Sequence, residues 1–322
     1  MDAIELHKST IVFDAHCDTL HDVLAGKRRL GERSRKGHLD LPRLREGGVT
    51  AQIFALFPGR EYLSHGAARR ALCLLEAFYQ EMEANPNALT LATSASDIER
   101  AKEEGKVAAI MGLEGAEALE GELGLLRIFY RLGVRNVGLT WNYRNRAGYG
   151  VKSEDKGLTE FGVELVRELN RLGVMIDVAH LAPTGVRDVL AISEAPVIAS
   201  HANAKALCPH RRNLSDELLE SIAEKGGVVG VTFVPSFLDP DEHHASLERV
   251  LDHIDHMVKV MGVDHVGLGS DFDGFSGQTR GLEDVTKLPG ITAGLLKRGY
   301  GEEEVRKILG GNFLRVFRQV VG

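Results

Sequence analysis

The chain has 322 residues, of which 43% are hydrophobic and 26% are charged; this composition predicts a globular protein with a large core and excludes disorder and a disulfide-stapled miniprotein. Lys and Arg number 39 against 46 Asp and Glu, for a net charge of −7, so the chain has no overall basic field and we expect no nucleic-acid partner. The length is compatible with two domains or with one α/β barrel.

Eight short runs of apolar and β-branched residues have the pattern of strands buried on both faces of a parallel sheet. In chain order these runs are 11–18, 49–57, 107–114, 134–141, 174–180, 196–201, 227–234 and 265–271. Helix-like stretches lie between them. Residues 159–172 carry apolar side chains at helical spacing and end at Gly173, and residues 215–225 end at Gly226. Another helix is predicted to begin with Ser96 as its N-cap and Glu99 at the capping-box position.

Eight strands that alternate with helices predict a (β/α)8 TIM barrel, an α/β fold. An open doubly wound sheet is the competing arrangement, but no GxGxxG motif follows the first predicted strand. We therefore expect a single barrel domain over residues 1–322, with extended βα loops and C-terminal helices.

The two ends of the chain and its cysteines indicate a cytoplasmic protein with no membrane partner. The first ten residues lack the basic and apolar regions of a secretory signal. Residues 313–322 are a short amphipathic piece rather than an anchor tail. The three cysteines, Cys17, Cys73 and Cys208, have no CxxC spacing, which argues against a disulfide framework and against a cysteine zinc site.

Histidine and carboxylate residues recur where the predicted strands end. They are His16 and Asp18 at the end of the first strand, Glu114 at the third, His180 at the fifth, His201 at the sixth and Asp271 at the eighth. A spacing of two places His16 and Asp18 on one face of a strand. Because the C-terminal strand ends of a barrel meet at one mouth, where barrel active sites are built, we expect these side chains to converge.

Imidazole and carboxylate donors without thiolates suit zinc, and this set is large enough for two ions. We expect His16 and Asp18 to bind one zinc, His180 and His201 to bind the other, and Glu114 to bridge them. Two adjacent ions acidify a shared water and give hydroxide at neutral pH. Asp271 is then left to accept the proton of the hydroxide and to pass it to a leaving amine.

Five motifs occur in order along nearly the whole chain: DAHCDT, GLEGAE, DVAH, SHA followed by Arg211-Arg212-Asn213, and GSDFDG. Together they resemble the membrane (renal) dipeptidase family of binuclear zinc dipeptidases, which are metal-dependent hydrolase barrels. The resemblance implies a TIM barrel, two zinc ions, a homodimer, and hydrolysis of free dipeptides, often with a D-residue at the C-terminal position. Some members of the family also open β-lactams.

The resemblance also assigns roles to individual residues. The zinc ligands of the family match His16, Asp18, Glu114, His180 and His201. Asp271 matches the catalytic acid/base, which can also meet the α-ammonium group of the substrate. Arg212 matches the arginine that pairs with the C-terminal carboxylate of the substrate, a task for which the bidentate guanidinium is suited.

The chain departs from the animal members at the end of the fourth predicted strand, where they carry a histidine that polarises the scissile carbonyl. Trp141 stands at that position and is followed by Asn142 and Tyr143. An indole cannot become a cation, so either zinc alone polarises the carbonyl, or Asn142 or Tyr143 substitutes. We treat all three as candidate substrate-binding residues, with core packing at the barrel mouth as the alternative role of Trp141.

Two other functions stay open at this point. A related barrel hydrolase could act on N-acyl-amino acids or lactones, and replacement of Arg212 would separate it from a dipeptidase. A catalytically silent metal-binding barrel is the second, although the full ligand set plus Asp271 argues against it. Among the remaining polar residues, we expect His253 and His256 to lie on a solvated helix face, and Asp273 to have a structural role.

Overall fold

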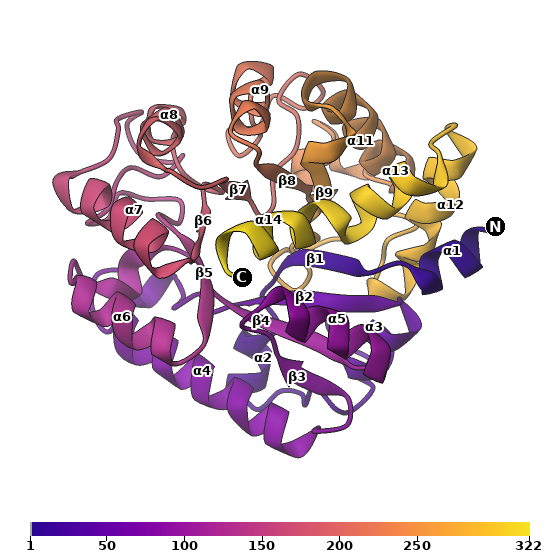
Figure 1. The fold of residues 1–322 in the computed structure, drawn as a ribbon, viewed down its shortest axis with the longest axis horizontal. Helices are drawn as coiled ribbons and strands as arrows, with labels where there is room; N and C mark the ends of the chain where they lie inside the picture. Colours follow the sequence, from indigo (N-terminus) through magenta and orange to yellow (C-terminus); the bar gives the residue numbers. More distant parts are fainter. Residues whose placement is uncertain (1) are drawn as a thin grey trace.

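The computed structural model describes residues 2–322 and contains a closed ring of eight parallel strands (Figure 1). The ring consists of β1 (Val12–Cys17), β2 (Val49–Ala55), β4 (Val107–Leu113), β5 (Val134–Gly138), β6 (Met175–Asp177), β7 (Ile198–Ala199), β8 (Val228–Val231) and β9 (Val266–Leu268). Pairing of β2 with β4 and of β9 with β1 closes the ring. The predicted TIM barrel is therefore confirmed.

A ninth strand, β3 (Leu89–Leu91), lies outside this ring and was not predicted. It pairs with the N-terminal half of β4, where Leu89 is opposite Val107, while β5 pairs with the C-terminal half of β4. A three-residue strand carries too little pattern to be separated from a loop. Several ring strands are also shorter than the apolar runs that predicted them, because the chain leaves the ladder before the run ends. The run 196–201, for example, contributes only Ile198–Ala199 to β7.

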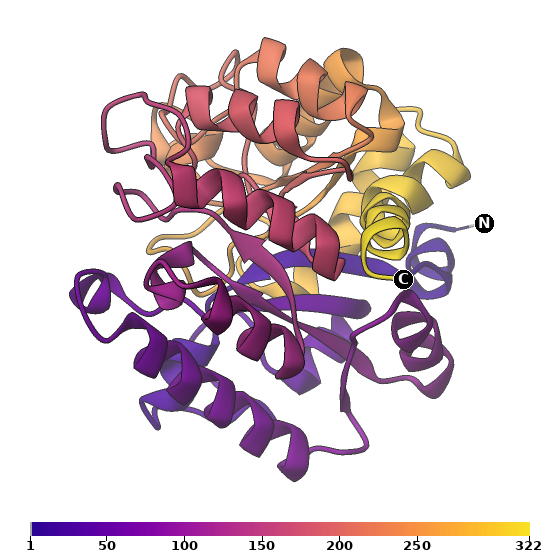
Figure 2. The same ribbon diagram turned by 60° about the vertical axis from the view of Figure 1, so that its left-hand side comes forward.

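The helices surround the ring of strands (Figure 1 and Figure 2). They are α1 (Ala3–Ser9), α2 (Leu20–Leu24), α3 (Leu41–Glu46), α4 (Ala67–Ala84), α5 (Ala95–Glu104), α6 (Leu123–Arg131), α7 (Glu160–Leu172), α8 (Pro183–Ile192), α9 (Asp216–Glu224), α10 (Pro235–Leu238), α11 (Leu247–Met261), α12 (Pro289–Lys297), α13 (Glu302–Arg306) and α14 (Asn312–Val320). Within residues 2–322, no helix has both the length and the apolar character needed to cross a bilayer.

The sequence placed some helix ends correctly and one incorrectly. Helix α7 begins after the N-cap Thr159 and ends at Gly173, which adopts a left-handed conformation, as predicted. Helix α5 begins two residues earlier than predicted, because Ser94 and not Ser96 is its N-cap. The backbone N–H of Asp97 donates to Ser94 Oγ at 3.3 Å, and the Asp97 carboxylate accepts from the Ser94 backbone N–H at 2.9 Å. This reciprocal pair is the capping box of α5.

The last long helix, α14, closes the end of the barrel that lies opposite the C-terminal strand ends. Phe313 and Phe317 of α14 join one buried apolar cluster with residues from six ring strands, including Phe13, Met175 and Val228. Residues from strands all round the ring can meet only in its interior, and each of these three lies at the beginning of its strand. Figure 1 accordingly shows α14 across the centre of the ring. The other end of the barrel is left for a site.

Candidate metal centre

The side chains that the sequence predicts to converge do meet at the C-terminal end of the barrel. His16 lies within β1 and Asp18 directly after it, Glu114 directly after β4, His180 and His201 shortly after β6 and β7, and Asp271 shortly after β9. The Nε2 atom of His16 lies 3.3 Å from Asp18 Oδ2, 3.6 Å from Glu114 Oε2 and 4.0 Å from Asp271 Oδ1. Candidate donor atoms from four different strands therefore lie within a few ångströms of one another.

Glu114 stands between two imidazole groups. Its Oε2 faces His16 Nε2 at 3.6 Å, and its Oε1 faces His180 Nε2 at 2.9 Å. The His180 Nε2 atom in turn lies 2.9 Å from His201 Nε2. Burial and the neighbouring Asp18 carboxylate raise the pKa of Glu114 well above its usual range. The two oxygens of one buried carboxylate thus face two different imidazoles, those of His16 and His180.

The three imidazoles are held in different electrostatic surroundings. Burial, together with the nearby Arg212 and His16, lowers the pKa of His180 well below its usual value, and His201 is shifted in the same direction. Both rings are therefore neutral at neutral pH and each retains a lone pair, as a metal ligand requires. At His16, burial lowers the pKa, but the carboxylates of Glu114 and Asp18 outweigh it and raise the pKa to about 10.

Two of the site residues have unusual backbone conformations. His180 has φ = 68° and Asp271 has φ = 63°, which is the left-handed region that residues other than glycine seldom adopt. Such strain is characteristic of functional sites, where the surrounding structure holds it in place. Burial raises the pKa of Asp271 to about 7, against the opposing influence of His16.

Buried hydrogen bonds hold the segment that carries Asp271 against β1. The Asp14 carboxylate accepts from the backbone N–H of Ser270 at 2.7 Å and from its hydroxyl at 2.6 Å. The backbone N–H of Asp271 donates to His16 O at 3.2 Å, and the backbone N–H of Asp18 donates to Phe272 O at 2.9 Å. These bonds bring the first and last ring strands together, and with them Asp18 and Asp271.

Asp273 lines the cavity at this mouth and is held there by hydrogen bonds and an ion pair. Its carboxylate accepts from the Thr19 hydroxyl at 2.6 Å and from the His38 backbone N–H at 2.6 Å, and it forms a buried ion pair with Arg28. Burial raises the pKa of Asp273, but the His38 side chain, the Arg28 guanidinium and the Thr19 hydroxyl lower it to about 2. Asp273 therefore anchors the 19–38 segment beside the site.

Arg212 lies at the same mouth with part of its guanidinium already engaged. It is 4% exposed, and Nη2 donates to His201 O at 3.0 Å. Its guanidinium carbon lies 5.5 Å from the centre of the Phe237 ring. Within residues 2–322, Nε of Arg212 is buried without a hydrogen-bond partner. A buried cation with unused donors beside an open cavity is suited to bind an anionic group.

A cavity of about 470 Å³ opens over this cluster. Asp18, Glu114, His180, Arg212 and Asp271 line it, while His16 and His201 lie deeper. Trp141 and Asn142 also line the cavity. The Trp141 ring packs against Phe57, with ring centres 4.9 Å apart.

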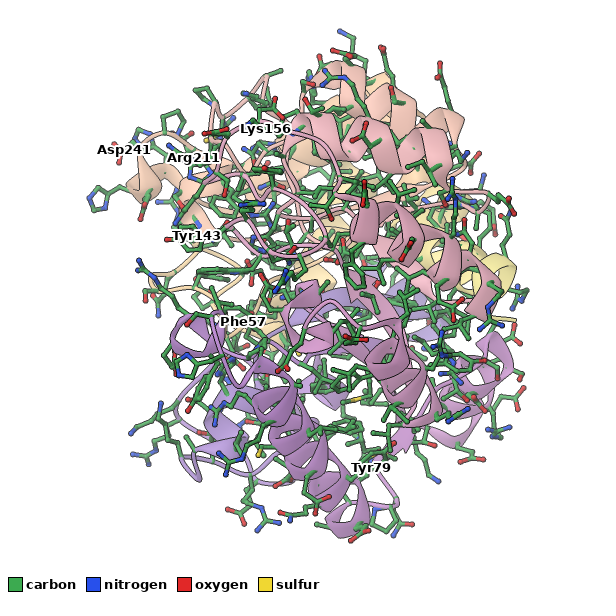
Figure 3. The ribbon with its side chains drawn as sticks, turned by 90° about the vertical axis from the view of Figure 1, so that its left-hand side faces the viewer. Phe57, Tyr79, Tyr143, Lys156, Arg211 and Asp241 are labelled. Carbon is green, nitrogen blue, oxygen red and sulfur yellow. The ribbon has the colours of Figure 1, made fainter. Side chains whose placement is uncertain are left out.

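Tyr143 is not among the residues that line this cavity, so the structure does not bring it into the cluster. Its ring packs edge-on against Trp141 at 5.6 Å and lies under the Arg60 guanidinium. Figure 3 shows Tyr143 at the same edge of the molecule as Phe57 and Arg211. Tyr143 therefore supports the wall of the cavity from outside.

Several residues at the site escaped the sequence reasoning. His21, Lys152 and His210 line the cavity, and Ser200 places its hydroxyl 2.8 Å from His201 Nδ1. His210 lies two residues before Arg212, and Ser200 lies directly before His201. This closeness in sequence to predicted site residues could have indicated that they belong to the site. Lys152 comes from a loop, and nothing in its sequence surroundings points to the site.

The sequence profile of the family described as membrane dipeptidase (peptidase family M19) matches residues 1–321. A dipeptidase from Claviceps purpurea (strain 20.1), tcpJ, is 36% identical over 95% of this chain and 76% of its own length. The crystal structure of dipeptidase AC, a metallopeptidase of family M19, superposes with a TM-score of 0.91 at 35% identity, covering 97% of this chain and 99% of that one. A metallopeptidase from Rhodobacter sphaeroides, solved with a phosphinate mimic of L-Ala-D-Ala, gives 0.90 at 34% identity with the same coverage.

Proposed function

Because the chain belongs to the membrane dipeptidase family, peptidase family M19, and is a metallo-dipeptidase, we propose that it uses two zinc ions to hydrolyse free dipeptides. We include dipeptides with a D-residue at the C-terminal position among its substrates. The relative solved with a phosphinate mimic of L-Ala-D-Ala supports that stereochemistry.

The donor set fits zinc, since it combines imidazoles and carboxylates without a thiolate. Asp18 Oδ1 is buried and, within residues 2–322, accepts no hydrogen bond. Gly274 keeps space open beside the carboxylates, because a Cβ there would lie 2.1 Å from Asp271 Oδ1 and 2.3 Å from Asp18 Oδ2. His16 and Asp18 would hold one ion and His180 and His201 the other. When bound, the zinc ions would supply Lewis-acid polarisation of the scissile carbonyl and lower the pKa of water.

The position of Glu114 carries this proposal. One of its oxygens faces His16 and the other faces His180, at 3.6 Å and 2.9 Å. A carboxylate that served only one ion, or only a hydrogen bond to one imidazole, would not need both oxygens directed at separate imidazole groups. Glu114 would therefore bridge the two ions.

The protein's own groups then orient the substrate and move the proton. Arg212 pairs with the free C-terminal carboxylate of the dipeptide and fixes the peptide bond over the cluster. Asp271 accepts a proton from the attacking water as the C–O bond forms, and then donates this proton to the leaving nitrogen as the C–N bond breaks. The same carboxylate can meet the α-ammonium group, which favours free dipeptides over longer chains. Trp141 and Asn142 lie on the cavity wall, where Trp141 contributes an apolar surface.

The test is a substrate panel on zinc-loaded protein. We expect L-Ala-L-Ala and L-Ala-D-Ala to be hydrolysed, with N-acetyl-L-alanine and a simple lactone turned over at least about 100-fold more slowly, since they lack the ammonium or the carboxylate that the site recognises. Product amino acids are quantified by chromatography. Faster turnover of the N-acyl compound or of the lactone than of every dipeptide would replace the proposal with the alternative amidohydrolase function.

A further inference from the structure

We propose that Asn142 is a positioning residue that fixes the tautomer and the ring plane of His180, so that Nε2 of His180 is presented to the metal site. The inference rests on the proposed function, because it concerns a residue assigned there as a zinc ligand. It gives Asn142 a role in the chemistry other than contact with substrate.

The contact itself sets the direction of the hydrogen bond. Asn142 Oδ1 lies 3.0 Å from His180 Nδ1, and both side chains are buried. An amide oxygen only accepts hydrogen bonds, so Nδ1 of His180 must carry the proton. Nε2 then carries the lone pair, and it is the atom that lies 2.9 Å from both Glu114 Oε1 and His201 Nε2. The contact therefore selects the tautomer in which Nε2 can coordinate a metal.

Asn142 is itself held by the loop that follows it. Its carbonyl accepts from the backbone N–H of Lys152 at 2.8 Å. Gly150 packs so closely against the Trp141 carbonyl that a Cβ at Gly150 would lie 2.1 Å from the oxygen. The loop also reaches His180 directly, since the backbone N–H of Val151 donates to His180 O at 2.9 Å. One loop thus holds both the ring and the left-handed backbone of His180.

The second imidazole on this side of the cluster has a less restrictive partner. His201 Nδ1 lies 2.8 Å from Ser200 Oγ, and a hydroxyl can either donate or accept. Ser200 can therefore accompany either tautomer of His201, whereas Asn142 in its observed orientation accompanies only one tautomer of His180. Loss of Asn142 should consequently release the tautomer of His180, whereas loss of a hydrogen bond elsewhere in the loop should not.

The experiment measures zinc retention rather than activity alone. Wild-type enzyme, Asn142→Ala, Asn142→Asp and Asn145→Ala are loaded with zinc and titrated with a competing chelator. Asn145 is the matched control: it lies in the same loop, its side chain forms hydrogen bonds to Leu139 O and to the backbone N–H groups of Ala147 and Gly148, and within residues 2–322 no hydrogen bond joins it to an imidazole. Loss of a partner that orients a metal-bound histidine typically weakens metal binding about 10- to 100-fold. We expect that loss for one of the two ions in Asn142→Ala, and near wild-type retention in Asn142→Asp, whose carboxylate also accepts from Nδ1.

A second measurement needs no variant. In zinc-loaded wild-type enzyme labelled with 15N-histidine, we expect His180 to carry a slowly exchanging proton on Nδ1, because this proton is donated to Asn142. Absence of that proton, equal zinc retention in Asn142→Ala and wild type, or an equal loss of zinc in Asn142→Ala and Asn145→Ala would each overturn the inference. None of these results would contradict the dipeptidase proposal, which would fail instead if the wild-type enzyme bound no zinc.

Discussion

The Asp271 carboxylate occupies the edge of the cluster, 4.0 Å from His16 Nε2, while Glu114 lies between the imidazoles. Asp271 also lines the cavity over the cluster, where a substrate would lie. A group in this position can exchange protons with water and with a leaving group without being needed to hold a metal. We therefore expect metal binding and turnover to respond differently when Asp271 is changed.

The variant Asp271→Asn tests that separation. It keeps the size of the side chain but removes the proton-accepting carboxylate, and loss of a general acid/base typically lowers the rate about 10²- to 10⁴-fold. We expect kcat for L-Ala-D-Ala to fall in that range, with zinc content unchanged by elemental analysis. A variant that keeps its zinc and retains full activity would refute the acid/base role.

At the same scale, we propose that Arg212 controls substrate choice by pairing with the C-terminal carboxylate of the dipeptide. Hydrogen bonds to charged groups contribute about 1.5–3 kcal/mol, so Arg212→Met should lower kcat/KM for a free dipeptide about 10- to 150-fold. The amide of the same dipeptide, which has no C-terminal carboxylate, should be hydrolysed by variant and wild type at similar rates. An equal loss for both substrates would show that Arg212 acts through its bond to His201 O rather than through the substrate.

Gly274 provides a residue-scale test of the spacing between carboxylates. A Cβ at this position would lie 2.1 Å from Asp271 Oδ1 and 2.3 Å from Asp18 Oδ2, so Gly274→Ala must displace both carboxylates or the backbone that carries the new Cβ. Misplacement by about 1 Å can lower catalysis about 10²-fold, and we expect a loss of kcat/KM of that order in steady-state assays. Gly124→Ala is the control, because a Cβ at Gly124 meets nothing within 4 Å. It should leave kcat/KM unchanged, and if Gly274→Ala did the same, the close approach would not matter.

The sequence pointed to the candidate ligands because each of them lies within a few residues of a strand end that has a clear apolar pattern. It could not reveal how His180 and Asp271 are aimed, since that depends on left-handed backbone conformations with φ near 68° and 63°. The contact between Asn142 and His180 could not be predicted from spacing either. The two residues are 38 positions apart, and the course of the loop that carries Asn142 brings them together. The roles predicted for Trp141 and Tyr143 likewise depended on loop geometry.

At the scale of the secondary-structure elements, α14 determines how the barrel is closed. Phe317 of α14 is fully buried in the cluster that fills the barrel interior, at the end remote from the candidate metal centre. The sequence predicted only a short amphipathic segment here. Such a pattern indicates that one face of the segment is covered, but it does not indicate which part of the protein covers it. Local sequence also failed to predict β3, which is only three residues long, and the exact start of α5, where both Ser94 and Ser96 are suitable N-caps.

The variant Phe317→Ala should therefore affect stability and not chemistry. Removal of a buried phenylalanine side chain lowers the free energy of unfolding by about 3–5 kcal/mol. We expect that loss in denaturant titrations, while kcat/KM of the folded fraction stays near the wild-type value. Gln319→Ala, at an exposed position on the same helix, should leave both quantities unchanged. A large fall in kcat/KM of the folded fraction would mean that the two ends of the barrel are coupled.

At the scale of the whole molecule, a buried histidine makes stability depend on pH. His253 was expected on a solvated helix face, but that expectation is wrong. Its side chain is buried between the backbone N–H of Ala204, which donates to Nδ1 at 3.2 Å, and Leu238 O, 2.9 Å from Nε2. Burial outweighs the bond to Leu238 and lowers the pKa of His253 to about 4. The helical spacing was read correctly, but this face of α11 is covered by Ala204 and by Leu238 at the end of α10, which the spacing cannot show.

Because His253 takes up its proton less readily in the folded state than in the unfolded state, its contribution to stability is complete above about pH 6.5 and is lost as the pH falls toward 4. Between pH 7 and pH 5, this shift should lower the free energy of unfolding by about 2 kcal/mol. His253→Gln cannot titrate and can form both hydrogen bonds. The difference between the two proteins in denaturant titrations at pH 7 and pH 5 measures the effect, and parallel pH dependences would contradict it.

The barrel as a whole was predictable because its eight ring strands are buried on both faces and read as separate apolar runs. The position of the site was predictable for the same reason, because the C-terminal ends of the ring strands meet at one mouth. The His16 Nε2 and Asp271 Oδ1 atoms lie 4.0 Å apart there. The cavity above them depends on loops such as the one that carries Lys152, whose course no local pattern encodes.

The most direct test of the central claim is the zinc content of the gently purified, zinc-supplemented protein and of its Glu114→Gln variant, measured by elemental analysis against chain concentration. If Glu114 joins two ions through its two oxygens, the wild-type protein holds two zinc ions per chain and the variant loses at least one of them. Less than one zinc per chain in the wild-type protein, or two in both proteins, would contradict a binuclear centre bridged by Glu114.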